Sequence, residues 1–234
     1  MQTKPLDKIP AAKLEELLAG IPFYTEWLSL ERKQYKLLLA HSKLLICDSN
    51  EVIINKGDFD SWFYVILKGQ VQIFPDESDQ ANQPVGYLGP GDMFGELALI
   101  MDSERTASVI ADPNAKEVIL LATDFSPFGD WDDFDQIKLE TKLPFYRKVV
   151  EITQWKVNNF QQQFPELTPS GHLNIMPPFS GEPNTIEELA FLHKQAEVLA
   201  QNLCAWNVTL DHSGQLIPSR VELKANILGG FDQL

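Results

Sequence analysis

An acidic and a basic residue flank a short apolar run in the segment FGELALIMDSERTASV, residues 94–109. Glu96 follows Gly95 directly, and Arg105 comes nine residues after Glu96. A helix that begins near Gly95 would present unpaired backbone N–H groups, and a glycine there lets a phosphate approach the backbone without meeting a Cβ atom. Arg105 can add a charged, forked donor to the same anion. These residue types at this spacing predict a site for a phosphate group.

Glu96 needs a separate explanation, because an ionised carboxylate repels phosphate and can only accept hydrogen bonds. A sugar hydroxyl next to the phosphate would supply the donor, so the segment favours a pocket for a phosphate joined to ribose. The alternative from the residues alone is a buried Glu96–Arg105 ion pair that stabilises the fold without any ligand. We favour the ligand, because an empty pocket would leave Arg105 and the helix-start amides without an anion.

Short apolar runs separated by turn residues surround this segment. The runs are rich in Val, Ile, Leu and aromatic residues, and Gly, Pro, Asp and Asn fill the turns between them. This pattern is typical of antiparallel strands in a compact roll, barrel or sandwich. The predicted strands are LLIC, EVII, WFYVIL, QVQIF, PVGYL, ASVIA and KEVILLA, between residues 44 and 122.

Helical periodicity brackets the strand region on both sides. Helices are predicted over residues 12–19, 22–42, 144–163 and 184–207. Asn184 or Thr185 would cap the last of these. The intervening residues 165–183 contain five prolines and read as a linker or wrapping segment. A turn and a final helix are expected in DHSGQLIPSRVELKANILGG, residues 211–230.

The segment from about residue 23 to residue 125 resembles the cyclic nucleotide-binding domain. That family includes the regulatory subunits of cAMP-dependent kinases, bacterial catabolite activators and cyclic-nucleotide-gated channels. FGELALI, followed after four residues by RTA, is similar to the family's phosphate-binding cassette in sequence and spacing. Gly57, Gly69 and Gly91 match the family's supporting glycines.

Together the pattern and the resemblance predict an α+β fold. N-terminal helices would precede an antiparallel, jelly-roll-like β-roll, followed by a long helix and a mainly helical C-terminal appendage. The expected divisions are an N-terminal helix (1–22), the binding domain (23–125), a helical region after the roll (126–164) and an acidic, mainly helical appendage (165–234).

The resemblance also implies seven ligand-binding residues and no metal. The backbone amides of the turn at residues 95–98 would face the cyclic phosphate, the Glu96 carboxylate would accept from the ribose 2′-hydroxyl, and Arg105 would pair with an exocyclic phosphate oxygen. The full set is Gly95, Glu96, Leu97, Ala98, Arg105, Thr106 and Ala107. A hydroxyl at Thr106 is found in binders of either nucleotide, so the ligand is cAMP or cGMP; we favour cAMP.

The helix predicted over residues 144–163 is the element that would report ligand occupancy. Its aromatic residues Tyr146, Trp155 and Phe160 are candidates for covering the base. The same stripe would also suit plain core packing or the seam of a homodimer. The expected activity is therefore that of a sensor that passes ligand binding to a protein partner, as yet unidentified, or to a second copy.

The main alternative is a transcriptional regulator of the catabolite-activator type. The formal net charge of −14 argues against contact with a phosphate backbone. Residues 165–234 hold three basic residues against eight acidic ones, too few for a recognition helix and its phosphate contacts. The nearest candidate for such a helix is SGQLIPSRVELKANI, residues 213–227. We therefore expect no nucleic-acid partner.

Other functional classes find little support in the sequence. The four histidines show no HxxxH or HExxH spacing, and we find no phosphate-binding loop, nucleophile elbow or kinase signature, so no enzyme is expected. No apolar run is long enough to span a bilayer, and no secretory signal is visible. Cys47 and Cys204 read as free thiols, which fits a cytoplasmic protein.

Overall fold

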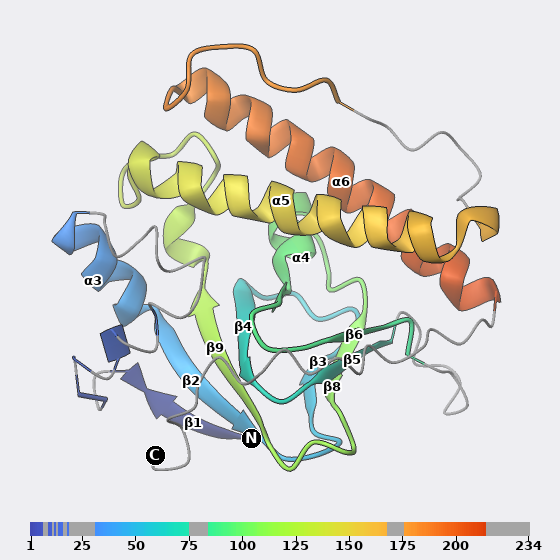
Figure 1. The fold of residues 1–234 in the computed structure, drawn as a ribbon. Coiled ribbons are helices and arrows are strands. Elements are labelled where there is room, and N and C mark those ends of the chain that lie inside the picture. Colours follow the sequence, from blue (N-terminus) through green and yellow to red (C-terminus); the bar gives the residue numbers. More distant parts are fainter. Residues whose placement is uncertain are drawn as a thin grey trace.

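Two antiparallel sheets and two long helices make up most of the described chain (Figure 1). The computed structural model describes residues 1–6, 9, 10, 12, 14, 15, 18, 31–74, 84–167 and 176–213, with side chains as far as residue 209. The α+β architecture predicted from the sequence is confirmed: an antiparallel β-roll is followed by helices that pack against it.

The strands form a five-stranded and a four-stranded sheet. The first has the order β1 (Gln2–Pro5), β2 (Ser42–Cys47), β9 (Val118–Asp124), β4 (Trp62–Lys68) and β7 (Met93–Phe94). The second has the order β3 (Val52–Ile54), β8 (Ser108–Ala111), β5 (Val71–Phe74) and β6 (Gly86–Leu88). All seven runs predicted as strands form strands, and β7, only two residues long, is an addition that no periodicity could reveal.

Strand β9 shows how the core is divided between two layers. Alternate side chains of a strand point to opposite faces. Leu121 accordingly joins the cluster that contains Leu143 and Val149 of the long helix α5 (Leu139–Gln163), whereas Leu120 joins the cluster between the sheets with Val109. Burial on both faces explains why β9 is apolar at nearly every position, VILLATD, rather than alternating.

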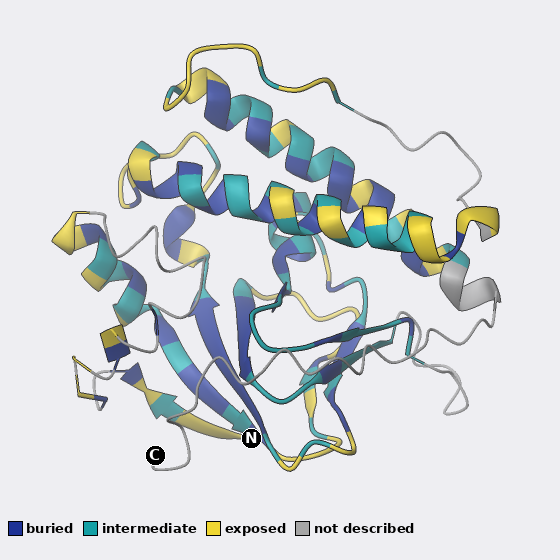
Figure 2. Ribbon diagram, viewed as in Figure 1, coloured by how far each residue is buried: buried dark blue, intermediate teal, exposed yellow. Residues whose placement is uncertain are grey.

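The helices lie on one side of the roll. They are α3 (Arg32–Ala40), α4 (Glu96–Met101), α5 (Leu139–Gln163) and α6 (Ile186–Ser213), with short 3₁₀ turns at Ser126–Phe128 and Pro165–Leu167. In Figure 1, α6 runs alongside α5, and both lie over the side of the roll that carries α4. The sides of α5 and α6 that face the roll are mostly buried, and their outer sides are exposed (Figure 2).

Helix α5 begins at Leu139, five residues before the predicted start at residue 144. Pro144 therefore lies inside the helix and removes one backbone hydrogen bond, which should disfavour that extension. A tertiary contact compensates: the fully buried Lys142 donates from Nζ to the carbonyl oxygen of Phe128, 2.6 Å away, and to that of Trp131, 3.3 Å away. The first turn is thus held by the loop before it.

The N-terminal segment differs from the helix predicted over residues 1–22. Residues 2–5 form strand β1, which pairs with β2 and satisfies the edge of that strand. Ala12, Leu14, Glu15 and Leu18 are helical, as predicted for 12–19. The helix predicted over residues 22–42 is wrong at its end, because Ser42 belongs to β2, where its hydroxyl lies 2.9 Å from that of Thr123. Residues 19–30 lie outside the described part.

The helix predicted over residues 184–207 is present and ends later than predicted. Helix α6 runs to Ser213, and Thr185 caps it by accepting the Glu188 backbone N–H on Oγ1 over 3.2 Å. Residues 176–185 are not helical, in agreement with a linker. Residues 168–175 and 214–234, which include the predicted final helix and most of the candidate recognition segment, lie outside the described residues. No helix in the described part combines the length and low charge needed to cross a lipid bilayer.

Candidate functional site

A cavity of about 120 Å³ lies where the four-stranded sheet, α4, α5 and α6 meet. All seven residues that the sequence singled out line it: Gly95, Glu96, Leu97, Ala98, Arg105, Thr106 and Ala107. Its remaining walls come from β3, β5, β6, β7 and β8 on one side and from α5 and α6 on the other. Residues far apart in the chain thus enclose the predicted cassette.

Gly95 shapes the turn that starts α4. Its φ of 88° is in the left-handed region, which side chains other than glycine rarely adopt. A Cβ at this position would lie 3.0 Å from Arg105 Nη1 and 3.1 Å from the Trp62 carbonyl oxygen. The glycine therefore serves two purposes: it allows the turn, and it lets Arg105 pass close to the backbone.

Gly57 provides a matched test of this interpretation. It has a φ of 85°, but a Cβ there would meet no atom within 4 Å. We expect Gly57→Ala to lower the free energy of unfolding by about 1–2 kcal/mol, the cost of the left-handed conformation. Gly95→Ala should cost at least about 1 kcal/mol more, because crowding is added to the same strain. Urea unfolding of both variants measures the difference, and equal losses would show that the close approach to Arg105 is unimportant.

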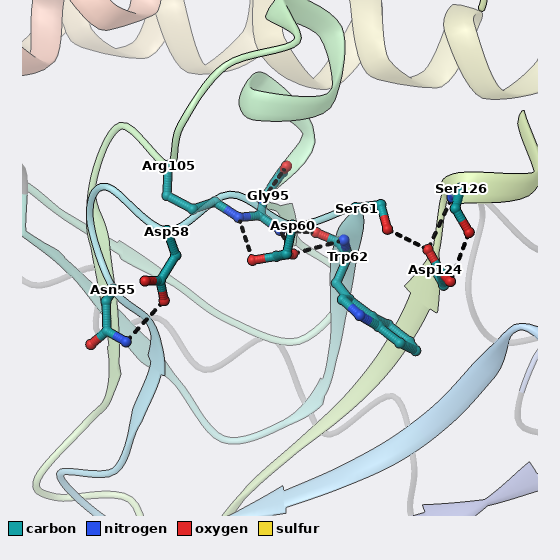
Figure 3. A network of polar contacts seen from close by, with 9 residues as sticks. All are labelled: Asn55, Asp58, Asp60, Ser61, Trp62, Gly95, Arg105, Asp124 and Ser126. Carbon is teal, nitrogen blue, oxygen red and sulfur yellow. Dashed lines mark hydrogen bonds and ion pairs between the residues drawn. The ribbon is translucent and has the colours of Figure 1, made fainter. Parts of the chain in front are cut away.

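Arg105 is 3% exposed and is held on several sides (Figure 3). Its Nε donates to Asp60 Oδ2 over 3.2 Å, and its Nη1 donates to the Gly95 carbonyl oxygen over 2.6 Å. Its Nη2 donates to Asp60 Oδ1 and to the Trp62 carbonyl oxygen. These bonds use four of the five guanidinium N–H groups, so one hydrogen on Nη1 has no partner in the described part of the chain.

Asp60 corrects one argument made from the sequence. Arg105 does not lack an anion in the absence of ligand, because the Asp60 carboxylate already balances its charge. Asp60 was not singled out beforehand. Its only signal was its place in the acidic turn GDFD before β4, and forty-five positions separate it from Arg105 in the sequence.

Glu96 is 1% exposed and pairs with a lysine of α5. Its Oε1 lies 2.6 Å from Lys156 Nζ, which also donates to the Met93 carbonyl oxygen over 2.9 Å. The alternative of a Glu96–Arg105 ion pair is therefore wrong: each residue has a different partner of opposite charge. Lys156 also lines the cavity. The only feature of the sequence that could have revealed its role is its position as a charged residue within an apolar helical stripe.

Thr106 connects the cassette to α6. Its side chain hydrogen-bonds the Cys204 thiol. Burial raises the pKa of Cys204, and the bond from Thr106 opposes that shift only in part. Because Leu203 and Asn207 of the same helix line the cavity, α6 closes the site that the cassette begins.

Only two of the three aromatic residues proposed to cover a base line the cavity. Trp155, 39% exposed, and Phe160 line the cavity. Tyr146 does not: it packs edge-on against Phe145 and His193, and burial raises its pKa. Tyr146 is thus a core residue. Within the described chain, no three His, Cys, Asp or Glu side chains gather closely enough to hold a metal ion.

Comparison with known proteins identifies the region around this cavity. Residues 46–126 match the model of the family described as the cyclic nucleotide-binding domain. The chain is 31% identical over 105 residues to a cAMP-dependent protein kinase regulatory subunit of Yarrowia lipolytica, covering 45% of this chain and 27% of that protein. It is 40% identical over 88 residues to a cGMP-dependent protein kinase of Plasmodium berghei, covering 38% of this chain and 10% of that protein.

A solved structure is also similar to this chain. The regulatory domain of Toxoplasma gondii PKA, crystallised with cAMP, matches with a TM-score of 0.45 and 19% identity over 67% of this chain and 55% of that one. The match to the family model ends at residue 126, before α5 and α6. The sequence similarity to the two curated relatives spans about a quarter or less of these proteins' length.

Proposed function

We propose that this chain, whose residues 46–126 belong to the cyclic nucleotide-binding domain family, is a regulatory protein that binds cAMP in preference to cGMP. The observation that carries the proposal is the cavity itself, which brings all seven cassette residues to one surface. The cyclic phosphate would lie against Arg105 and the turn that starts α4. The ribose 2′-hydroxyl would donate to Glu96.

Two partly used cations favour an anionic ligand. Among the described residues, Arg105 retains one Nη1 hydrogen, and Lys156 uses two of its three ammonium hydrogens, on Met93 and Glu96. Since Asp60 and Glu96 already balance these two charges, the ligand must also draw on the helix-start amides of α4. A singly charged cyclic phosphate demands less compensation here than a doubly charged phosphate monoester would.

Lys156 gives the ligand a means of moving α5. It joins α5 to Glu96 and to the backbone of β7, so the position of α5 depends on what the Glu96 carboxylate binds. A ribose hydroxyl that donates to Glu96 competes with, or realigns, the Lys156 ammonium. The ligand then has different contacts with two positions of α5, which is what a shift in their populations requires.

Hydrogen exchange measured with and without cAMP tests binding and this link together. Saturating cAMP should slow amide exchange in residues 95–107 and in residues 154–163 of α5, with α3 unchanged as the internal control. Unchanged exchange throughout the cavity residues would contradict the proposed function. Protection of residues 95–107 without any change in α5 would support binding and contradict the link through Lys156.

The remaining parts of the proposal concern the chain around the site. Residues 23–125 form the binding domain, 126–164 report its occupancy, and 165–234 present the surface that a protein partner or a second copy recognises. The activity is regulatory rather than catalytic, with no metal. Because Cys47 and Cys204 are both free thiols, the cytoplasm is the compartment that suits the chain.

A further inference from the structure

Three carboxamide side chains on the long helices line the cavity: Asn159 and Gln163 on α5, and Asn207 on α6. The first two are bonded to each other, because Gln163 Nε2 donates to Asn159 Oδ1 over 3.1 Å. Asn207 is only 9% exposed, and its amide makes no hydrogen bond within the described part of the chain. Because Asn207 lines the cavity, its amide must take hydrogen bonds from whatever molecule occupies that cavity, which makes it a candidate contact for a ligand.

Asn207 lies on the side of α6 that lines the cavity. On α6, Cys204 contacts Thr106, and Asn207 follows almost one turn later on the same side as Leu203. Trp206, beside Asn207, is fully buried with Val85, the residue just before β6. Asn207 therefore lies in the cavity wall almost one turn of α6 beyond the residue that contacts Thr106.

The apolar part of the cavity wall suits a flat ring. Ile73, Leu88 and Val109 of the four-stranded sheet line it, with Phe160 of α5. Apolar side chains of this kind can cover the faces of a purine but cannot distinguish its edges. Recognition of the edge must come from a polar group, and Asn207 is the polar side chain that the described part of α6 contributes to the cavity lining.

We propose that Asn207 recognises the base and selects adenine over guanine, an inference that rests on the proposed function. A carboxamide matches adenine with two hydrogen bonds: it accepts from the 6-amino group and donates to N7. Guanine offers two acceptors, O6 and N7, along the same edge, so the amide oxygen is left without a donor. Helix α6, which lies outside the matched family region, thus supplies the specificity of the site.

The unaltered chain can test this with modified nucleotides. Binding of cAMP is compared by calorimetry with cGMP, with 7-deaza-cAMP, which lacks N7, and with purine riboside 3′,5′-cyclic monophosphate, which lacks the 6-amino group. Each should bind roughly 5- to 100-fold more weakly than cAMP, the loss expected for one bidentate base contact. This series needs no change to the protein and so cannot be confused with misfolding.

Variants at Asn207 then connect the selectivity to the residue. Asn207→Ala should bind cAMP, 7-deaza-cAMP and the analogue without the 6-amino group with equal affinity. Asn207→Asp has nearly the same shape but only acceptors, so it keeps the bond from the adenine 6-amino group and loses the bond to N7; it should still favour cAMP over cGMP but bind 7-deaza-cAMP no more weakly than cAMP. Asn158→Ala removes an exposed carboxamide of α5 outside the cavity and should leave the preference for cAMP unchanged. Circular dichroism establishes that each variant is folded.

The outcomes separate this inference from the function it rests on. An unaltered chain that binds no cyclic nucleotide overturns both. A chain that binds cAMP but treats the deaza and 6-unsubstituted analogues as equals of cAMP overturns only the role of Asn207. The same holds if folded Asn207→Ala loses affinity for every nucleotide by one common factor. If neither variant folds, the series of nucleotides on the unaltered chain still decides.

Discussion

Replacing Arg105 by methionine is expected to weaken cAMP binding by about 100-fold or more. The variant removes the guanidinium that would pair with the phosphate. It also leaves the Asp60 carboxylate, 34% exposed on its side chain, without its partner and close to the place of the phosphate. The loss therefore contains two parts, a missing attraction and a new repulsion between like charges. Calorimetric titration of the folded variant measures their sum.

A second variant separates the two parts. Arg105→Met combined with Asp60→Asn removes the repulsion but not the missing attraction, so affinity should recover in part and stay below that of the unaltered chain. Arg32→Met removes an exposed arginine of α3 far from the cavity lining and should leave binding unchanged. If Arg105→Met stays folded and binds cAMP within about threefold of normal, Arg105 does not contact the phosphate.

Glu96→Gln is expected to weaken cAMP binding by about 10- to 100-fold. The ribose 2′-hydroxyl would donate to a charged carboxylate in the unaltered chain and to a neutral amide oxygen in the variant. The nucleotide 2′-deoxy-cAMP should show a similar loss on the unaltered chain and little further loss on Glu96→Gln, since both changes remove the same bond. Calorimetry with the four combinations of protein and ligand measures this.

The same substitution carries a cost in stability that serves as a check. Lys156 is 11% exposed on its side chain and would lose its charged partner, which should lower the free energy of unfolding by about 3 kcal/mol. Glu151→Gln, at a glutamate of α5 that is 68% exposed on its side chain, should change neither binding nor stability appreciably. Losses from Glu96→Gln and 2′-deoxy-cAMP that simply add would contradict a contact between Glu96 and the ribose.

The parts of the fold that the sequence predicted are those specified by local pattern. Strands rich in branched and aromatic residues, the glycine that starts α4 and the cap at Thr185 each depend on neighbours along the chain. The start of α5 was misplaced for the opposite reason. Lys142 anchors the first turn to the carbonyl groups of a preceding loop, and nothing in the helical periodicity reveals that contact.

In the candidate site, too, the local features could be predicted from the sequence and the tertiary contacts could not. The positions of Glu96 and Arg105 followed from a motif within sixteen residues, but their partners Lys156 and Asp60 lie sixty and forty-five positions away. Lys156 was visible only as a charge within an apolar stripe. Asn207 was read as part of a helix, because its place in the cavity depends on how α6 packs over α5 and α4. Such packing is a tertiary property that a single sequence does not display.

Calorimetric titration of cAMP into the unaltered chain tests the central claim, that the cavity around Gly95 and Arg105 is shaped for a cyclic nucleotide. The account predicts saturable binding of one nucleotide per chain, with a dissociation constant in roughly the micromolar range or tighter, and weaker binding of cGMP. A folded chain that takes up neither nucleotide at millimolar concentration would contradict it.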